Sequence, residues 1–404
     1  MIAVALTLRV ALILWLHSYE FPPTRDHFAF GFETGSIARS LATGEGFSSP
    51  FGDHTGPTAW VAPAYPYLCA GVFRLFGLFT NTAGLVILFL NSVFSALTCL
   101  PILLIGERTV GQKAGLGAAW AWAIVPLFMR WPATWVWDMS LSALLLSLLF
   151  LFTLRLGETP NRRQWLAFGV FWGLAALTNP ALLSFLPFSL AWAAQRARRE
   201  GKSCWGLVLL AVVACALVVS PWLLRNWLVF GRPVFLRSNF WFEFHLGNYH
   251  LSNGMGWQGK HPTINHAEYE KYRRLGEMAY VEAARREGVE FVRQYPGEFV
   301  LLSLKRFLWF WDGESLLYEH SPYELWRPWM ILTFSVLVLL GLLVALRQRV
   351  QGAALFLCLL LFYPSVYYLT YPNHRYRHAI EPELLLLTSY LLCQMVDYLR
   401  ARSS

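Results

Sequence analysis

The sequence is poor in charged residues. Only 14% of its 404 residues are Asp, Glu, Lys or Arg, whereas 56% are hydrophobic and the mean hydropathy is +0.43. A soluble domain of this length carries charge at about a quarter of its positions. This shortage, together with apolar stretches near the length that crosses a bilayer, excludes an ordinary soluble protein and predicts an integral membrane protein.

Cysteine patterns and nucleotide-binding motifs are also lacking. The six cysteines lie in or beside apolar segments and show no CxxC spacing, so we predict neither a disulfide framework nor a zinc site. The chain has no GxxxxGK[ST] and no GxGxxG motif, which argues against ATP-driven work and against a nucleotide-sugar donor. We therefore expect no cofactor; a divalent metal stays open but is not required by the sequence.

What is present is a series of apolar stretches. They predict an all-α, polytopic transmembrane helical bundle of about ten spans, with extracytoplasmic interfacial helices and a helical outer loop region. The expected spans are 2–16, 82–104, 114–129, 137–156, 165–178, 181–194, 205–223, 328–346, 352–370 and 380–397. The first lacks a small-x-small cleavage site after it, so we interpret it as an uncleaved span. Arg9 in its middle indicates either a start further upstream or a side chain that faces the bundle interior.

Charge separates the loops into two sets. One set carries thirteen basic and four acidic residues, which accounts for the whole formal net charge of +9. The basic members are Arg108, Lys113, Arg155, Arg162, Arg163, Arg196, Arg198, Arg199, Lys202, Arg347, Arg349, Arg400 and Arg402. Because cytoplasmic loops are enriched in Lys and Arg, this set is expected inside the cell. The positive balance therefore reflects orientation, and no nucleic-acid partner is expected.

Two large polar segments then lie on the outer side, at 17–80 and 224–327. They divide the chain into a bundle with the first outer loop (1–223), an outer helical segment (224–327) and C-terminal transmembrane helices (328–404). We expect a helix over 28–43, a re-entrant or interfacial helix over 63–79 and a helix over 266–294 that Asn265 and Glu268 cap. Pro296 starts a further helix, in which Lys305 and Arg306 between aromatic residues suit the headgroup layer.

Acidic residues at the outer border are the first candidates for chemistry. Asp26 and Glu33 lie seven positions apart and would share one face of a helix. Asp138 stands among tryptophans at the start of an expected span, where an acid is costly unless it is paired or functional. A second interpretation of Asp138 stays open, because a first-turn acid also favours the helix dipole. Asp26 has the alternative of ordinary loop polarity.

The basic counterpart is a short outer turn before the last span. His374, Arg375, Arg377 and His378 cluster there, and arginine suits bidentate binding of phosphate. Cations placed where a departing phosphate gains charge would stabilise the transition state of a transfer reaction. The alternative is an anchor for ordinary lipid headgroups. Arg225 belongs to a second basic group after the seventh span, where anchoring competes with donor binding.

Several runs resemble the bacterial GT-C glycosyltransferases, similar to the protein O-mannosyltransferase and aminoarabinose transferase group. In the first outer loop these are Glu33–Arg39 (ETGSIAR), Gly44–Pro50 (GEGFSSP) and Thr58–Leu68 (TAWVAPAYPYL). Arg225–Gly231 (RNWLVFG) and Arg375–Pro382 (RYRHAIEP) are similar to later landmarks of the group. The resemblance covers nearly the whole chain.

The resemblance implies transfer of a sugar from a polyprenyl-phosphate donor to a lipid, glycan or protein acceptor on the non-cytoplasmic face. It also implies a catalytic acid in the first outer loop, usually an Asp-Glu pair seven and six places before Ile37. Here those places hold Phe30 and Gly31, so Glu33 is the nearest acid and Asp26 the alternative. Asp138 matches the acid of the group's second outer loop. The catalytic candidates are thus Glu33, Asp138 and Asp26, and the candidates for donor phosphate binding are Arg375, Arg377, His374 and Arg225.

A transporter or flippase of lipid-linked saccharides is the alternative function, and a structural or assembly protein is a third. A transporter predicts polar residues through the middle of its spans, where this sequence has little charge apart from Arg9. The expected location is a bacterial inner membrane, with membrane lipids around the bundle and the active site on the periplasmic side.

Overall fold

The computed structural model describes residues 1–21, 30–52, 54–156, 161–199, 204–250, 252–255, 259–313 and 322–403. Within these ranges the regular structure is helical, apart from one isolated antiparallel bridge between Ser48 and Pro57. The expectation of an all-α fold is therefore confirmed.

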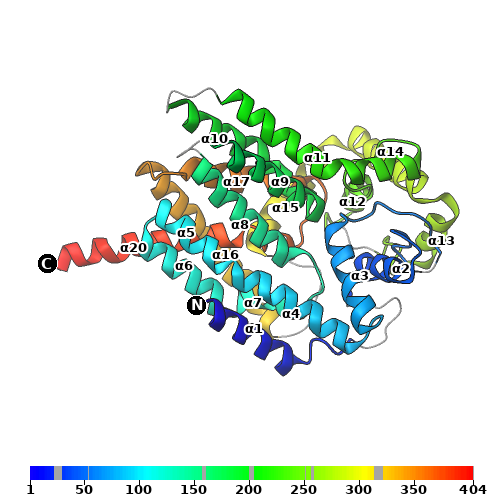
Figure 1. Cartoon of the computed structure of the whole chain (residues 1–404), viewed down its shortest axis with the longest axis horizontal. Helices are drawn as coiled ribbons and strands as arrows, with labels where there is room; N and C mark the ends of the chain where they lie inside the picture. Colours follow the sequence, from blue (N-terminus) through cyan, green and yellow to red (C-terminus); the bar gives the residue numbers. More distant parts are fainter. Residues whose placement is uncertain are drawn as a thin grey trace.

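Most helices form a bundle that occupies the larger part of the molecule (Figure 1). The bundle helices up to the 224–327 segment are α1 (Ile2–Leu16), α4 (Asn81–Leu97), α5 (Cys99–Arg108), α6 (Gln112–Ile124), α7 (Pro126–Thr134), α8 (Met139–Leu156), α9 (Arg162–Thr178), the 3-10 helix η2 (Pro180–Phe185), α10 (Leu186–Arg199) and α11 (Trp205–Phe230). Those after it are α16 (Pro322–Arg347), α17 (Ala353–Phe362), α18 (Ser365–Leu369), α19 (His374–Arg377) and α20 (Glu381–Ser403).

Four helical stretches are long and apolar enough to cross a bilayer. They are Asn81–Arg108, which joins α4 and α5, then Met139–Leu156, Trp205–Phe230 and Trp326–Arg347. Within the described residues the other expected spans are shorter or less apolar, such as α1 with its 15 residues. The expected stretch 114–129 divides at Val125, just before Pro126, because proline cannot donate the hydrogen bond that would continue α6.

Small residues bring the bundle helices into close contact. A Cβ added to Gly106 of α5 would lie 2.2 Å from the Cα of Gly115 in α6, so only glycine fits at this crossing. Such close approach is typical of membrane helices, where van der Waals packing replaces the hydrophobic drive between helices. The pair α9 and α11 packs in the same manner, since a Cβ on Gly169 would lie 2.2 Å from the carbonyl oxygen of Ala211.

Arg9 faces the bundle interior and is fully buried. Its Nη2 donates to the carbonyl of Trp122 at 2.8 Å, and its Nη1 donates to the carbonyl of Ala123 at 3.1 Å. Its Nε donates to Ser95 at 3.0 Å. The guanidinium thus satisfies carbonyl groups that the end of α6 leaves without helical partners. Of the two interpretations that the sequence left open, the structure therefore shows the interior-facing one.

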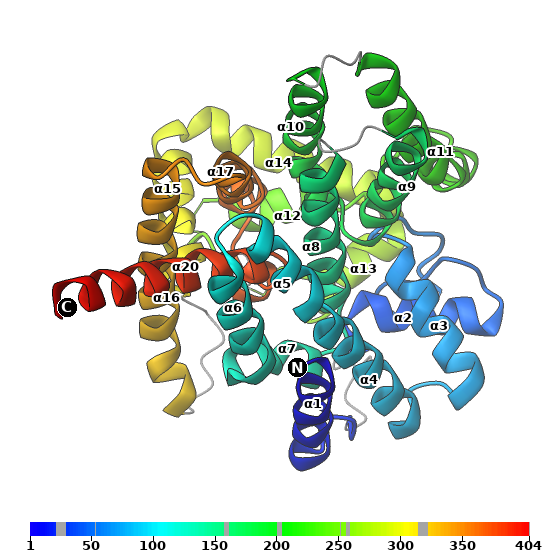
Figure 2. The same cartoon turned by 60° about the vertical axis from the view of Figure 1, so that its left-hand side comes forward.

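Parts of the two outer segments meet at the end of the molecule distant from the C terminus (Figure 1). The first contributes α2 (Glu33–Thr43) and α3 (Ala64–Phe76). The second contributes α12 (Phe240–Gly247), α13 (His266–Leu275), α14 (Glu277–Gln294) and α15 (Pro296–Asp312). Figures 1 and 2 both show α2 and α3 close to α13.

The expected single helix over 266–294 is wrong, because it breaks at Gly276. This residue has a φ of +74° and separates α13 from α14. The expected cap is confirmed, because Asn265 accepts a hydrogen bond from the backbone N–H of Glu268 at 3.2 Å.

The expected headgroup position of Arg306 is wrong too, because its side chain is fully buried. Its guanidinium donates to the carbonyls of Gly247 and Gly254, and the expectation failed because a basic-aromatic pattern does not show which way a residue faces.

The break at Gly276 lets Glu277 turn inward and join the two outer segments. Its buried carboxylate accepts hydrogen bonds from the hydroxyl of Thr58, from the backbone N–H of Ala59 at 2.8 Å and from the hydroxyl of Tyr272 at 2.9 Å. Burial raises the pKa of this carboxyl group, and these hydrogen bonds offset part of that rise. Glu277 is therefore the anchor that holds α14 against the first outer loop.

Replacing Glu277 with Ala is expected to lower the free energy of unfolding by about 1–3 kcal/mol, because three buried donors lose their acceptor. Thermal unfolding of the purified protein in detergent measures this loss. Glu282→Gln on the exposed side of the same helix is the matched control and should change the melting temperature little. Equal melting temperatures for the two variants would contradict the anchoring role.

Candidate active site

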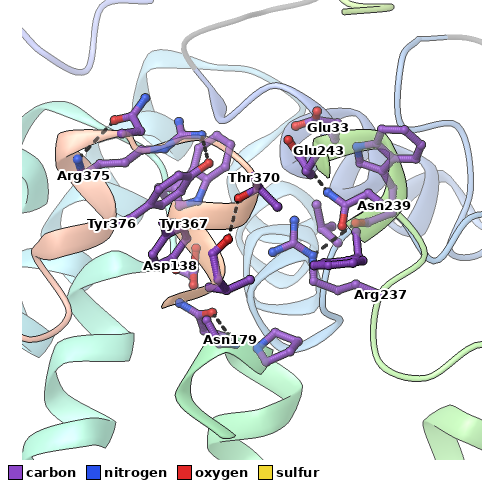
Figure 3. A pocket seen from close by; sticks show the side chains of 18 of the residues that line it. Glu33, Asp138, Asn179, Arg237, Asn239, Glu243, Tyr367, Thr370, Arg375 and Tyr376 are labelled. Carbon is purple, nitrogen blue, oxygen red and sulfur yellow. Dashed lines mark hydrogen bonds between the residues drawn. The ribbon is translucent and has the colours of Figure 1, made fainter. Parts of the chain in front are cut away.

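A cavity of about 600 Å³ lies where the two outer segments meet the bundle. Its wall combines residues from the start of α2, the segment before α8, the start of η2, the connection between α11 and α12, and the α18–α19 region. The polar members of the wall are Glu33, Asp138, Asn179, Arg237, Asn239, Glu243, His261, Tyr367, Thr370, Tyr371, Asn373, Arg375 and Tyr376, and Figure 3 shows most of them. The rest of the lining is largely aromatic and apolar, as in most ligand-binding cavities.

Glu33 begins α2 and is almost fully buried, with 6% of its surface exposed. An acid in the first turn interacts favourably with the helix dipole. Its Oε1 lies 3.2 Å from Nε2 of His261, a residue from the second outer segment. The backbone N–H of Thr263 donates to Nδ1 of the same ring at 3.2 Å, so Nδ1 is an acceptor. His261 therefore carries its proton on Nε2 and donates it to Glu33.

This environment keeps the Glu33 carboxylate ionised. Burial raises its pKa, but the interactions with His261, a backbone hydrogen bond and the positive charge of Arg375 together outweigh that effect. The pKa of Glu33 therefore lies below its ordinary value, and the group carries a negative charge at neutral pH.

Asp138 immediately precedes α8, and it lines the cavity together with its sequence neighbours Trp137 and Met139. Its Oδ2 accepts the hydroxyl proton of Ser142 at 3.0 Å, and Ser142 in turn accepts from Nδ2 of Asn179 at 3.4 Å. Burial raises the pKa of Asp138, although Ser142 and the charges of Arg237 and Arg375 act in the other direction. The two sequence-predicted acids thus share one cavity, and their pKa values are shifted in opposite directions.

Arg375 lies in the short helix α19 and contributes a cation to this wall, which Arg237 also lines. Its guanidinium carbon is 3.9 Å from the ring centroid of Trp137, and its Nη2 lies 3.3 Å from the hydroxyl of Tyr376. Stacking on tryptophan fixes the plane of the guanidinium group. Its Nε has no hydrogen-bond partner within the described part of the chain, which leaves a donor for an anionic ligand.

The structure places three of the other predicted residues away from the cavity wall. Arg377 is buried and donates to Ser335 at 2.7 Å, and the ring of His374 packs on Trp131 with 4.8 Å between centroids. Arg225 donates to the carbonyl oxygens of Thr58 and Phe47 at 2.6 and 2.7 Å. Asp26 lies outside the described residues. The roles of these four residues stay predictions.

Four polar residues of the wall were not singled out as site residues from the sequence. Arg237, Asn239, Glu243 and His261 all belong to the second outer segment, where no motif marked them. Asn239 donates to Oε1 of Glu243 at 2.7 Å, and Nε of Arg237 donates to the carbonyl of Trp60 at 3.3 Å. The one available signal was their position, because polar residues that follow the seventh span must lie near the outer border.

The described residues of this cavity do not form a ready set of ligands for a divalent metal. Among the described residues, no three His, Cys, Asp or Glu side chains are grouped closely enough to hold a metal ion. The Glu33–His261 pair supplies only two ligands, and the two groups already bond each other.

Comparisons with known proteins agree with this architecture. Residues 59–224 match the family model of dolichyl-phosphate-mannose-protein mannosyltransferases, which is about two fifths of the chain. No curated protein sequence matches the chain.

Among solved structures, the oligosaccharyltransferase of Archaeoglobus fulgidus in complex with Zn and sulfate superposes with a TM-score of 0.51 at 14% identity, covering 98% of this chain and 50% of that one. The same archaeal enzyme, AglB, in complex with an inhibitory peptide and a dolichol-phosphate gives 0.51 at 13% identity, covering 100% and 51%. ArnT from Cupriavidus metallidurans bound to undecaprenyl phosphate gives 0.43 at 15% identity, covering 96% and 77%.

The resemblance to GT-C glycosyltransferases is thereby confirmed by the family match and, with AglB, at the level of the fold. The chain spans about half the length of the archaeal oligosaccharyltransferase.

Proposed function

We propose that this protein is a membrane glycosyltransferase that moves a sugar from a polyprenyl-phosphate donor to an acceptor on the non-cytoplasmic face of the membrane. The observation that carries this proposal is the cavity itself, in which an ionised carboxylate, a second acid and an arginine face one space. The match to mannosyltransferases that use a lipid-phosphate donor supports the same chemistry.

The reaction needs three groups, and the cavity offers a candidate for each. The acceptor hydroxyl or amine attacks the anomeric carbon of the sugar, and its proton passes to the Glu33 carboxylate as general base. The bond between the anomeric carbon and the phosphate oxygen breaks, and the electron pair stays on the departing polyprenyl phosphate. Arg375 and the hydroxyl of Tyr376 stabilise that anion. A carboxylate near the anomeric carbon also stabilises the oxocarbenium-like transition state, which is the role proposed for Asp138.

No step of this reaction passes through a metal, although a divalent ion stays compatible with the sequence. We further propose that the protein lies in a bacterial inner membrane, with about ten spans, interfacial helices and the 17–80 and 224–327 segments outside. Positive charge in the opposite loops supports this orientation.

A cysteine introduced at Asn373 should react with a membrane-impermeant thiol reagent in intact cells. Labelling only after lysis would show that this residue faces the cytoplasm and that the proposed orientation is wrong.

Sugar transfer in membranes that contain the protein tests the function. A polyprenyl-phosphate sugar with a labelled sugar is incubated with these membranes, and the label is followed into a product that no longer extracts with the donor. Transfer that depends on the protein is the expected result. A donor that crosses the bilayer without being consumed would instead support the transporter alternative.

Replacing His261 with Phe is expected to shift the acid side of the pH profile of kcat/KM to higher pH. The aromatic ring keeps its packing against Phe51 and Phe242, but Glu33 loses the donor that lowers its pKa. A hydrogen bond to a charged group contributes about 1.5–3 kcal/mol, equivalent to about one to two pH units.

The sign follows from the direction of the shift. Because Glu33 acts as a base only when ionised, a higher pKa removes activity at acidic pH first and leaves activity at pH 8 less affected. Gln294, on the exposed part of α14, gives a control variant, Gln294→Ala, which should keep the wild-type profile. An unchanged acid limb in His261→Phe would contradict the assignment of Glu33 as the ionising base.

A further inference from the structure

The cavity contains more polar groups than phosphate release and proton transfer require. Arg237, Asn239 and Glu243 lie at the entry of α12, and Figure 3 shows them with Glu33 on one side of the cavity, while Arg375, Tyr376 and Asp138 lie on the other. Glu243 is neither the proposed base nor part of the phosphate-binding group.

Hydrogen bonds from the bundle and the first outer loop hold this segment in place. The indole N–H of Trp222 donates to the carbonyl of Leu236 at 2.9 Å, and Nδ2 of Asn226 donates to the carbonyl of Phe235 at 3.1 Å. The backbone N–H of Ser238 donates to the carbonyl of Ala59 at 2.9 Å. The side chains that follow are therefore presented from a preorganised backbone.

The protein gives the Glu243 carboxylate one hydrogen bond of ordinary geometry. Its Oε1 accepts from Asn239 at 2.7 Å, whereas Oε2 is buried without a hydrogen-bond partner within the described part of the chain. A buried acceptor of this kind usually has a partner, and a ligand in the cavity is the partner that the geometry allows. Burial raises the pKa of Glu243 and the nearby Glu33 carboxylate raises it further, while Arg237, His261 and the neighbouring hydroxyl of Tyr371 lower it.

We propose that Arg237, Asn239 and Glu243 form a subsite that binds hydroxyl groups of the transferred sugar and excludes sugars that carry a carboxylate. This inference rests on the proposed function and adds the class of sugar. A carboxylate acceptor beside amide and guanidinium donors matches hydroxyl groups, each of which donates and accepts. A uronic acid would place its negative charge against the Glu243 and Glu33 carboxylates. Arg237 is the cation on that side of the cavity, whereas Arg375 lies on the other side.

Competition binding to the purified full-length protein tests the subsite without requiring turnover. Labelled polyprenyl phosphate is displaced by three unlabelled probes: polyprenyl phosphate, polyprenyl-phosphate mannose and polyprenyl-phosphate mannuronic acid. Wild type is expected to prefer the mannosyl probe over the mannuronyl probe by at least about tenfold, because a repulsive charge and lost hydrogen bonds both act against the acid.

Glu243→Gln is expected to reduce this preference to within about threefold, and to leave the affinity for unglycosylated polyprenyl phosphate within about twofold of wild type. Glu243→Asp keeps the charge with a shorter side chain, so it should weaken mannose binding and still exclude mannuronic acid. Glu290→Gln, on the exposed side of α14, is the matched control for a lost carboxylate.

Two results would overturn the inference. One is equal affinity of wild type for all three probes, and the other is a parallel loss of affinity for all three in both Glu243 variants. Failure of the proposed function has a different signature, because wild type would then fail to bind even the unglycosylated carrier.

Discussion

Glu33→Gln should abolish most sugar transfer while it leaves the lipid carrier bound. Glutamine has the same size and still accepts the hydrogen bond from His261, which lies 3.2 Å from the carboxylate. It cannot take the proton of the acceptor, and general base catalysis contributes about 10²- to 10⁴-fold to a rate. We therefore expect kcat to fall by at least about a hundredfold, with the inhibition constant of polyprenyl phosphate nearly unchanged.

Glu45 in the same outer loop gives the matched control. It is exposed and accepts from the hydroxyl of Thr43 at 3.2 Å, so Glu45→Gln removes a carboxylate of the same loop without touching the cavity. Transfer by Glu33→Gln within about tenfold of wild type would refute the base assignment. A much larger loss in Asp138→Asn than in Glu33→Gln would transfer that role to Asp138.

The pKa shifts of the two acids separate these outcomes further. Glu33 has a lowered pKa and stays ionised in mildly acidic solution, whereas the pKa of Asp138 is raised. If Glu33 alone must be ionised, activity extends further into acid than it does when Asp138 must also be ionised. The pH profile of Asp138→Asn therefore shows which carboxylate limits the reaction in acid. If its acid limb disappears or moves, the limiting group in wild type is Asp138; if the limb stays, the limiting group is Glu33.

Many of the helices could be predicted from sequence because local patterns carry that information, whereas the side of the membrane for each loop stays a prediction. The Asn265 cap and the proline start of α15 appear in the structure as expected. Glu33, Asp138 and Arg375 were also chosen from local features, namely an acid or arginine at the expected outer border, and the structure gathers all three in one cavity. Their catalytic roles stay predictions.

The direction in which a side chain points could not be predicted in the same way. Arg375 and Arg377 are two residues apart and chemically identical, yet Arg375 faces the cavity and Arg377 faces Ser335 between α15 and α16. The contact between His261 and Glu33 joins residues more than 200 positions apart, and no periodicity encodes such a pairing. The hydrogen bond between Glu277, next to the break at Gly276, and Thr58 joins residues more than 200 positions apart and is again a tertiary contact.

Arg375→Gln is expected to weaken the binding of polyprenyl phosphate by about ten- to a hundredfold and to reduce transfer by about a thousandfold. The larger loss in transfer follows because the departing phosphate gains charge in the transition state, where a preorganised cation acts most strongly. Arg375→Lys should recover only part of both, since an ammonium group keeps the charge but loses the planar contact with Trp137 at 3.9 Å.

Arg377→Gln is the sharpest comparison, because it removes the same group two residues away. Its guanidinium is buried against Ser335 and the ring of Phe334, so its loss should lower the melting temperature and leave the inhibition constant of polyprenyl phosphate within about twofold. Arg232→Gln on the exposed outer surface controls for general loss of positive charge. If Arg377→Gln weakened carrier binding as strongly as Arg375→Gln, both arginines would hold the phosphate. The proposed placement of the leaving group at Arg375 alone would then be wrong.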